Sequence, residues 1–222
     1  MILREIREKI KSGDLKNTQQ VVDLYHSLIG NVSNSGWALT ANDGVAHRQD
    51  FIEFKKGNVI KFDSWYIDPD TGLWLDGAIT VEFGSDNHDT MITATKRYLI
   101  EGIKAAKVGN SIGDIGRAVE AIEAEHHNLK IIRCLSGHGI GEAIHKFPRV
   151  YNYADGPDAE VSISEGMRLA IEPLCMQDGA EFLDDTWSVS QGVATHYEAT
   201  IQIINGKPVV LYGDVLQSEI DD

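Results

Sequence analysis

The sequence is poor in cysteine and has no long apolar stretch. Its two cysteines, Cys134 and Cys175, are too few for a disulfide framework, and no CxxC pair is present. No apolar run is long enough to cross a bilayer, and the charged N-terminus lacks the apolar segment of a secretory signal. We therefore expect a reduced, cytoplasmic protein without a membrane partner.

Basic residues are also scarce. The chain has 20 lysines and arginines against 34 aspartates and glutamates, a formal net charge of −14. Nucleic-acid binding needs a basic surface that contacts phosphates, so we expect no nucleic-acid partner. What is present is an ordinary globular composition, 42% hydrophobic and 24% charged, which can bury a core.

The length of 222 residues suits one large domain or two small ones. We expect a single domain over residues 1–222, with a short N-terminal helical segment at 1–31 and a polar C-terminal tail at 214–222, of which residues 217–222 are frayed. Apolar spacing and glycine turns predict further helices at 89–108 and 112–127. Alternation and turn residues predict strands at 37–40, 45–47, 58–67, 73–83, 130–135, 168–176, 195–204 and 207–212.

The two halves of the chain resemble each other in the order of their elements. In each half, a helix, a glycine turn and a second helix precede two strands, and each of these strands carries one carboxylate. Asp63 and Asp76 lie on the first pair, whereas Glu172 and Glu198 lie on the second. This order predicts a pseudo-twofold α/β fold in which the two hairpins lie side by side and their four carboxylates converge.

Five polar residues sit in short apolar or glycine-flanked segments that we interpret as strands or strand ends. Acidic side chains are rarely buried unless they are paired or bind metal. Four carboxylates carry a charge of −4, which two divalent cations would cancel, and a neutral histidine adds a nitrogen ligand. The pattern predicts a dinuclear hydrolase centre formed by Asp63, Asp76, His138, Glu172 and Glu198.

The most specific segment is SGHGIGEAIHKFP, residues 136–148. Gly137 and Gly139 flank His138 and allow the backbone to approach a ligand closely. His145 follows seven residues later, outside this tight loop. Two histidines around a glycine-rich loop favour a functional role for both.

These motifs resemble those of the methionine aminopeptidases. The resemblance rests on GHGIG with a downstream His and Pro, on IEP and on YEAT, and it extends to VIKFDSWYI, LWLDGAITVEFG, NDGVAHRQD and DDTWSVSQG. It covers roughly residues 36–212, and the short segment between His138 and Glu172 is similar to the bacterial type I branch. The resemblance implies an α+β "pita-bread" fold, with pseudo-twofold α/β halves and an antiparallel sheet, which prolidases and creatinases share. Prolidases usually carry a separate N-terminal domain, and we expect none before Asp63.

The resemblance also implies a metal-ligand set. Asp63 would chelate one ion, Asp76 and Glu198 would bridge both, and His138 and Glu172 would complete the second. The implied cofactors are two divalent metal ions, with manganese, iron or cobalt favoured by the oxygen-rich ligands and zinc possible. The implied reaction is hydrolysis of the N-terminal methionine from peptides or nascent proteins by a bridging water, with Glu172 as general base and then acid.

The resemblance implies substrate contacts as well. His47 and His145 would hold the scissile amide, and Trp187, Ile144 and Ala38 would line the substrate pocket. The chain departs from the family there: NVSNSGW replaces an aromatic loop, Ala38 a cysteine and Ile144 a phenylalanine. The departures leave two alternatives open, an aminopeptidase of the same fold with altered N-terminal specificity and a non-catalytic peptide-binding module.

Two smaller expectations complete the sequence-based interpretation. His196 precedes Glu198 by two residues, and its spacing fits a supporting role beside the metals as well as a purely structural one. We also expect the protein to act as a monomer.

Overall fold

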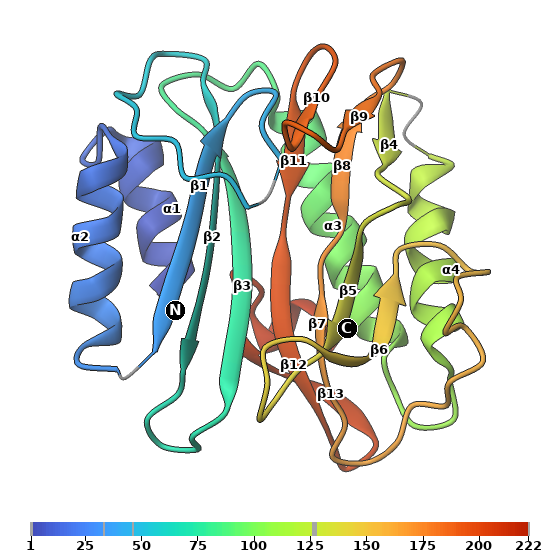
Figure 1. Ribbon diagram of the computed structural model, residues 1–222. Coiled ribbons are helices and arrows are strands. Elements are labelled where there is room, and N and C mark those ends of the chain that lie inside the picture. Colours follow the sequence, from blue (N-terminus) through green and yellow to red (C-terminus); the bar gives the residue numbers. More distant parts are fainter. Residues whose placement is uncertain (1, 33, 46, 126–127, 222) are drawn as a thin grey trace.

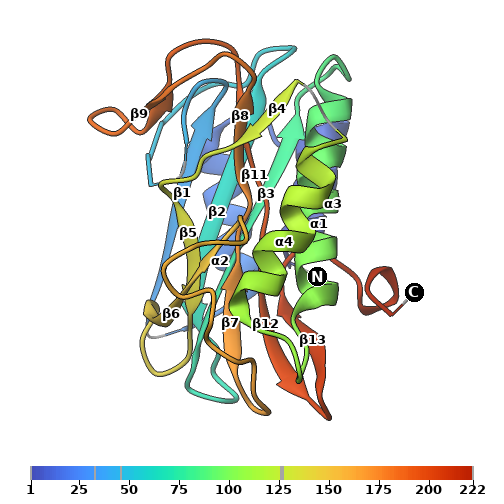
Figure 2. The same cartoon turned by 90° about the vertical axis from the view of Figure 1, so that its right-hand side faces the viewer.

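A layer of helices covers one face of a large antiparallel sheet (Figures 1 and 2). The computed structural model describes residues 2–32, 34–45, 47–125 and 128–221. Its helices are α1 (Ile2–Ser12), α2 (Thr18–Ile29), α3 (Asp89–Ala105), α4 (Ile112–Glu123) and the short 3₁₀ helix η1 (Gln217–Glu219). None of the helices in these ranges is long and apolar enough to cross a membrane.

The main sheet has the strand order β1-β2-β3-β12-β7-β5-β6, and β13 also pairs with β12. Its strands are β1 (Ser35–Ala41), β2 (Val59–Ile67), β3 (Trp74–Glu82), β5 (Ser136–Gly139), β6 (Lys146–Tyr151), β7 (Arg168–Ile171), β12 (Glu198–Ile204) and β13 (Lys207–Tyr212). Two small sheets join β4 (Leu129–Ile131), β8 (Leu174–Gln177) and β11 (Ala194–His196), and β9 (Phe182–Leu183) with β10 (Ser188–Val189).

The helices form where apolar residues recur at helical spacing and dock on the sheet. In α1, Leu3, Ile6 and Ile10 are fully buried at intervals of three and four residues. Helix α2 is capped by Asn17, whose side chain accepts a hydrogen bond from the Gln20 backbone N–H. The buried faces of these helices anchor the sheet from one side.

Alternation along β2 gives the sheet two different faces. The Phe62 ring packs edge-on against Tyr25 of α2, with ring centroids 5.6 Å apart, so Phe62 points to the helical layer. Successive side chains of a strand point to opposite faces, so Asp63 points away from the helices. We call this second side the open face, and it carries the polar residues described below.

The predicted hairpins and their side-by-side arrangement are confirmed. Strands β2 and β3 pair along their length, and β12 joins β3 to β7. The predicted strands at 168–176 and 195–204 are each broken, because Pro173 cannot donate a ladder hydrogen bond and the chain leaves the main sheet at Tyr197. The outer pieces, β8 and β11, pair with each other instead.

Other sequence predictions are less accurate. The predicted strand at 45–47 is wrong, because Val45 and His47 lie in a loop, and residue 46 lies outside the described residues. Of the strand predicted at 130–135, only the first part forms, as β4. Strands β5 and β6 were not predicted, since glycines dominate one and charged residues interrupt the other. The helix predicted at 112–127 ends earlier, at Glu123, and its last two predicted positions lie outside the described residues.

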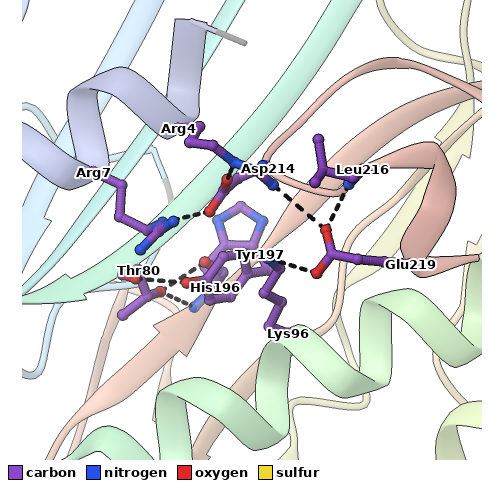
Figure 3. A network of polar contacts seen from close by, with 9 residues as sticks. All are labelled: Arg4, Arg7, Thr80, Lys96, His196, Tyr197, Asp214, Leu216 and Glu219. Carbon is purple, nitrogen blue, oxygen red and sulfur yellow. Dashed lines mark hydrogen bonds and ion pairs between the residues drawn. The ribbon is translucent and has the colours of Figure 1, made fainter.

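The prediction that the end of the C-terminal tail is frayed is wrong for residues 217–221, which form η1 and its contacts. Asp214 is 1% exposed, and its carboxylate binds Arg4, with an Nε–Oδ1 distance of 2.9 Å, and Arg7. Glu219 lies 3.1 Å from the Lys96 ammonium of α3. Figure 3 shows this tail network, which we define as Arg4, Arg7, Lys96, Asp214 and Glu219. The arginines of α1 hold the tail because they neutralise its buried carboxylate.

Candidate metal centre

The strand register brings three carboxylates together on the open face. Asp63 of β2 lies opposite Ala78 of β3, and Glu198 of β12 lies opposite the same alanine from the other side. Asp76 precedes Ala78 by two residues, so it shares this face. Ligand atoms of Asp63, Asp76 and Glu198 all lie within 4.8 Å of one another. The small side chain of Ala78 leaves room between them.

A second group lies beside the first and shares Glu198 with it. His138 of β5 pairs with Ala170 of β7, and Glu172 follows Ala170 by two residues at the end of that strand. The His138 Nε2 atom lies 3.5 Å from Glu172 Oε1, and ligand atoms of His138, Glu172 and Glu198 lie within 4.8 Å of one another. The five predicted ligands therefore form two adjoining groups, which we call the metal centre.

The hydrogen bonding of His138 fixes which ring nitrogen faces the carboxylates. Its Nδ1 lies 3.0 Å from the Gly139 carbonyl oxygen, which can only accept a hydrogen bond. Nδ1 therefore carries the proton, and the lone pair of Nε2 points toward Glu172. Metal-binding histidines in proteins are commonly oriented in this way.

Burial and hydrogen bonding of the carboxylate oxygens indicate whether the centre can bind a cation. Asp63, Asp76 and Glu198 are 6%, 5% and 2% exposed. One buried oxygen of each, Asp63 Oδ1, Asp76 Oδ1 and Glu198 Oε1, has no hydrogen-bond partner among the described residues. Such oxygens are costly to bury without a partner, and a divalent cation would satisfy them. The residues therefore fit a metal site.

Burial and mutual repulsion govern protonation of the apoprotein. Burial raises the pKa of Asp63 to about 7. Burial, followed by repulsion from neighbouring carboxylates, raises the pKa values of Asp76, Glu172 and Glu198 well above their usual range. Burial lowers the pKa of His138 to about 4, so its imidazole is neutral at pH 7. Metal binding must therefore displace protons from carboxyls and none from His138.

His196 also belongs to this neighbourhood. Its Nε2 lies 3.7 Å from Glu172 Oε2 and 4.0 Å from Glu198 Oε2, and the residue is 2% exposed. Neither ring nitrogen has a hydrogen-bond partner within the described part of the chain. Its backbone N–H and C=O both bind Thr80 Oγ1, at 2.8 and 2.6 Å, as Figure 3 shows. The two-residue spacing from Glu198 was the sequence signal for this position.

A cavity of about 830 Å³ opens beside the metal centre. His47, His145 and Trp187 lie on its wall, as predicted for substrate contacts. The His145 ring packs edge-on against His138 at 4.4 Å, and the His47 ring packs against Trp187 at 4.6 Å. Desolvation and the nearby His145 lower the pKa of His47, which favours its neutral form. A neutral imidazole can donate one hydrogen bond to a bound amide.

Two predicted pocket residues lie elsewhere. Ala38 is 3% exposed and pairs with Asp63 across β1 and β2, whereas Ile144 is half-buried in the loop before His145. Neither is among the described residues that line the cavity. Their contact with substrate stays a prediction. The apolar part of the cavity wall comes instead from Leu135, Phe147, Leu174 and Trp187.

Comparison with known proteins agrees with this centre. The model of metallopeptidase family M24 matches residues 2–205. The chain belongs to family M24. This family is metal-dependent, so the chain is a hydrolase that uses divalent metal ions, in agreement with its buried carboxylates.

The chain is also similar to individual proteins that are named methionine aminopeptidases. The chain is 33% identical to the methionine aminopeptidase of Aquifex aeolicus over 183 residues, 78% of this chain and 70% of that protein. It is also 33% identical to the methionine aminopeptidase of Borreliella burgdorferi over 147 residues, but this match spans only 58% of that protein.

Solved structures confirm the predicted pita-bread fold. The methionine aminopeptidase of Thermotoga maritima superimposes with a TM-score of 0.74 at 25% identity, covering 94% of this chain and 90% of that one. The prolidase of Pyrococcus furiosus superimposes with a TM-score of 0.69 at 18% identity, covering 94% and 60%. The latter similarity concerns the fold alone.

Proposed function

We propose that this chain is a methionine aminopeptidase that removes N-terminal methionine from peptides or nascent proteins with two divalent metal ions. The observation that carries the proposal is the pair of ligand groups that share Glu198 and line a cavity of about 830 Å³. The relatives named methionine aminopeptidase support the choice of reaction. We further propose that residues 1–222 form one catalytic domain that acts as a cytoplasmic monomer.

The ligand roles follow the two groups. Asp63, Asp76 and Glu198 would hold one ion, and His138 and Glu172 would hold the second together with the shared carboxylates. Four carboxylates and one imidazole favour manganese, iron or cobalt and also permit zinc. When bound, the ions supply Lewis acidity that lowers the pKa of a water and polarises the substrate carbonyl.

The protein's own side chains would move the proton and hold the amide. Glu172 would accept a proton from the attacking water and return it to the leaving amine. His145 and His47 would donate hydrogen bonds to the scissile amide and to the charge that develops on its oxygen. Trp187, with Leu174 and Leu135, would form an apolar wall for the N-terminal side chain and exclude water.

The experiment is to load the purified protein with manganese, iron, cobalt or zinc and measure methionine release from a Met-Ala-Ser peptide. We expect release that depends on metal and is abolished by a chelator. A protein that binds no stoichiometric metal and cleaves nothing would be a peptide-binding module instead.

The positions of Ala38 and Ile144 outside the cavity wall favour a second candidate, an aminopeptidase with another N-terminal preference. A peptide library that varies the first residue separates the two candidates. Cleavage of leucine or proline peptides as fast as methionine peptides would reject methionine specificity.

A further inference from the structure

Arg149 lies next to the metal centre but is not one of its five ligands. Strand β6 pairs with β5, and in their antiparallel register Arg149 lies opposite His138. Residues opposite each other in such a pair point to the same face of the sheet, with Cβ atoms about 5 Å apart. Arg149 accordingly lines the same cavity as His138 and Glu172.

The guanidinium of Arg149 has no ion-pair partner among the described residues. Within the described residues its side chain makes one weak hydrogen bond, from Nη1 to the Tyr151 hydroxyl at 3.5 Å. Two charged residues near it on the cavity wall already have partners in the chain. Lys146 pairs with Glu142, and Asp158 accepts a hydrogen bond of 2.8 Å from the Arg149 backbone N–H. An unmatched cation is thus exposed to the cavity of a protein whose net charge is −14.

Arg149 and Trp187 lie on different parts of the cavity wall. Trp187 directly precedes β10, which lies near the upper end of the molecule in Figure 1, whereas β6 lies lower down at the edge of the main sheet. A peptide whose first side chain packs against Trp187 would therefore continue toward β6 after the scissile bond. An extended peptide advances about 3.3 Å per residue, so its next one or two residues come within reach of an arginine side chain.

We propose that Arg149 binds a carboxylate of the substrate two residues beyond the scissile bond. The protein would then favour peptides that carry an acidic side chain or a free C-terminus there. This inference rests on the proposed peptidase function. A guanidinium suits this task because it binds a carboxylate through two parallel hydrogen bonds and keeps its charge at any working pH.

The test compares Met-Ala-Gln amide with two peptides that each add one carboxylate, Met-Ala-Glu amide and Met-Ala-Gln with a free C-terminus. We expect the manganese-loaded protein to have an about tenfold lower KM for at least one charged peptide, with little change in kcat. The two charged peptides distinguish a side-chain carboxylate from a C-terminal one. Glu-Ala-Gln amide, compared with Gln-Ala-Gln amide, reports any preference for an acid at the N-terminal position.

Three variants identify the residue responsible. Arg149→Gln should abolish the preference for the charged peptide, and Arg149→Lys should retain part of it because the charge remains. Arg97→Gln is the matched control, because Arg97 lies on α3 in the helical layer, where it pairs with Glu125 at 2.7 Å. This control removes the same charge and should leave the preference unchanged.

Binding without turnover separates this proposal from the peptidase function. The same peptides with the first amide reduced to a methyleneamine cannot be hydrolysed, and calorimetry gives their Kd. A preference for carboxylate that depends on Arg149 supports the subsite, even if no peptide is cleaved and the peptidase proposal fails. Equal Kd values for charged and neutral peptides overturn it, as does a preference that survives Arg149→Gln or that concerns only the N-terminal residue.

Discussion

Two regions of this protein bury carboxylates in opposite ways. In the tail network, Asp214 is 1% exposed and both of its oxygens bind arginines of α1. In the metal centre, Asp63 and Asp76 are almost as buried, yet each keeps an oxygen without a partner in the described residues. A buried acid whose cation comes from the chain stabilises the fold. A buried acid that no cation of the chain neutralises is suited to binding a metal ion.

The first prediction concerns Glu172 of the metal centre and has the largest effect on turnover. Glu172→Gln removes the proposed general base and should lower kcat by at least about 100-fold. Steady-state kinetics with a Met-Ala-Ser peptide measures this, together with the metal content of the variant. Glu160→Gln, at an exposed position, is the control. Near-normal turnover of the Glu172 variant would remove Glu172 from its catalytic role.

The second prediction compares the two regions by their contribution to the free energy of unfolding of the metal-free protein. Asp214→Asn should lower the free energy of unfolding by about 2 kcal/mol, since two arginines lose their partner. Asp76→Asn should not lower it, because the change relieves repulsion among buried carboxylates. Urea denaturation measures both, with the exposed Asp70→Asn as control. If both variants lose stability equally, the distinction between the regions is wrong.

The third prediction concerns pH. Burial raises the pKa of Asp63 to about 7, and burial followed by repulsion from neighbouring carboxylates raises the pKa values of Asp76, Glu172 and Glu198 well above their usual range. Protons therefore compete with metal at neutral pH, and affinity should rise from pH 6 to pH 8, by about tenfold per pH unit for each proton released. Calorimetric titration with manganese in buffers of different ionisation enthalpy counts these protons. Affinity that is constant over this range would contradict the protonation of the apoprotein.

The fourth prediction concerns His196 and the affinity for manganese. Its Nε2 lies 3.7 Å from Glu172 and 4.0 Å from Glu198, and neither ring nitrogen has a hydrogen-bond partner among the described residues. We therefore expect the ring to orient these two glutamates when metal binds. His196→Ala should weaken manganese binding about tenfold, and His196→Gln should restore part of that loss with its amide donor. Unchanged affinity in both variants would leave His196 a purely structural residue.

Most of the positions in the metal centre could be inferred from sequence because each is an acid in an apolar strand. The alternation on β2 and β3 put Asp63 and Asp76 on one face, and in the structure they converge with Glu198 on that face as the repeat predicts. Strand breaks were harder to predict. Glu172 lies at the end of β7 and Glu198 at the start of β12, where each chain segment moves to a second sheet.

The tail network and Arg149 could not be predicted from local pattern. Asp214 meets Arg4 across 210 residues of sequence, so no spacing rule connects them. The position of Arg149 depends on the register of β6 against β5, and β5 is too short and too rich in glycine to be recognised as a strand. The positions of Asp214 and Arg149 depend on pairing between distant segments, whereas the local alternation of the strands indicated the positions of the metal ligands.

Metal stoichiometry shows whether the unpartnered carboxylates of the metal centre bind two cations. The purified protein, stripped with chelator and titrated with manganese or cobalt, should bind two ions per chain. The Asp76→Asn variant should lose at least one of them. Binding of no ion by the wild-type protein, or the same stoichiometry in Asp76→Asn, would contradict the account.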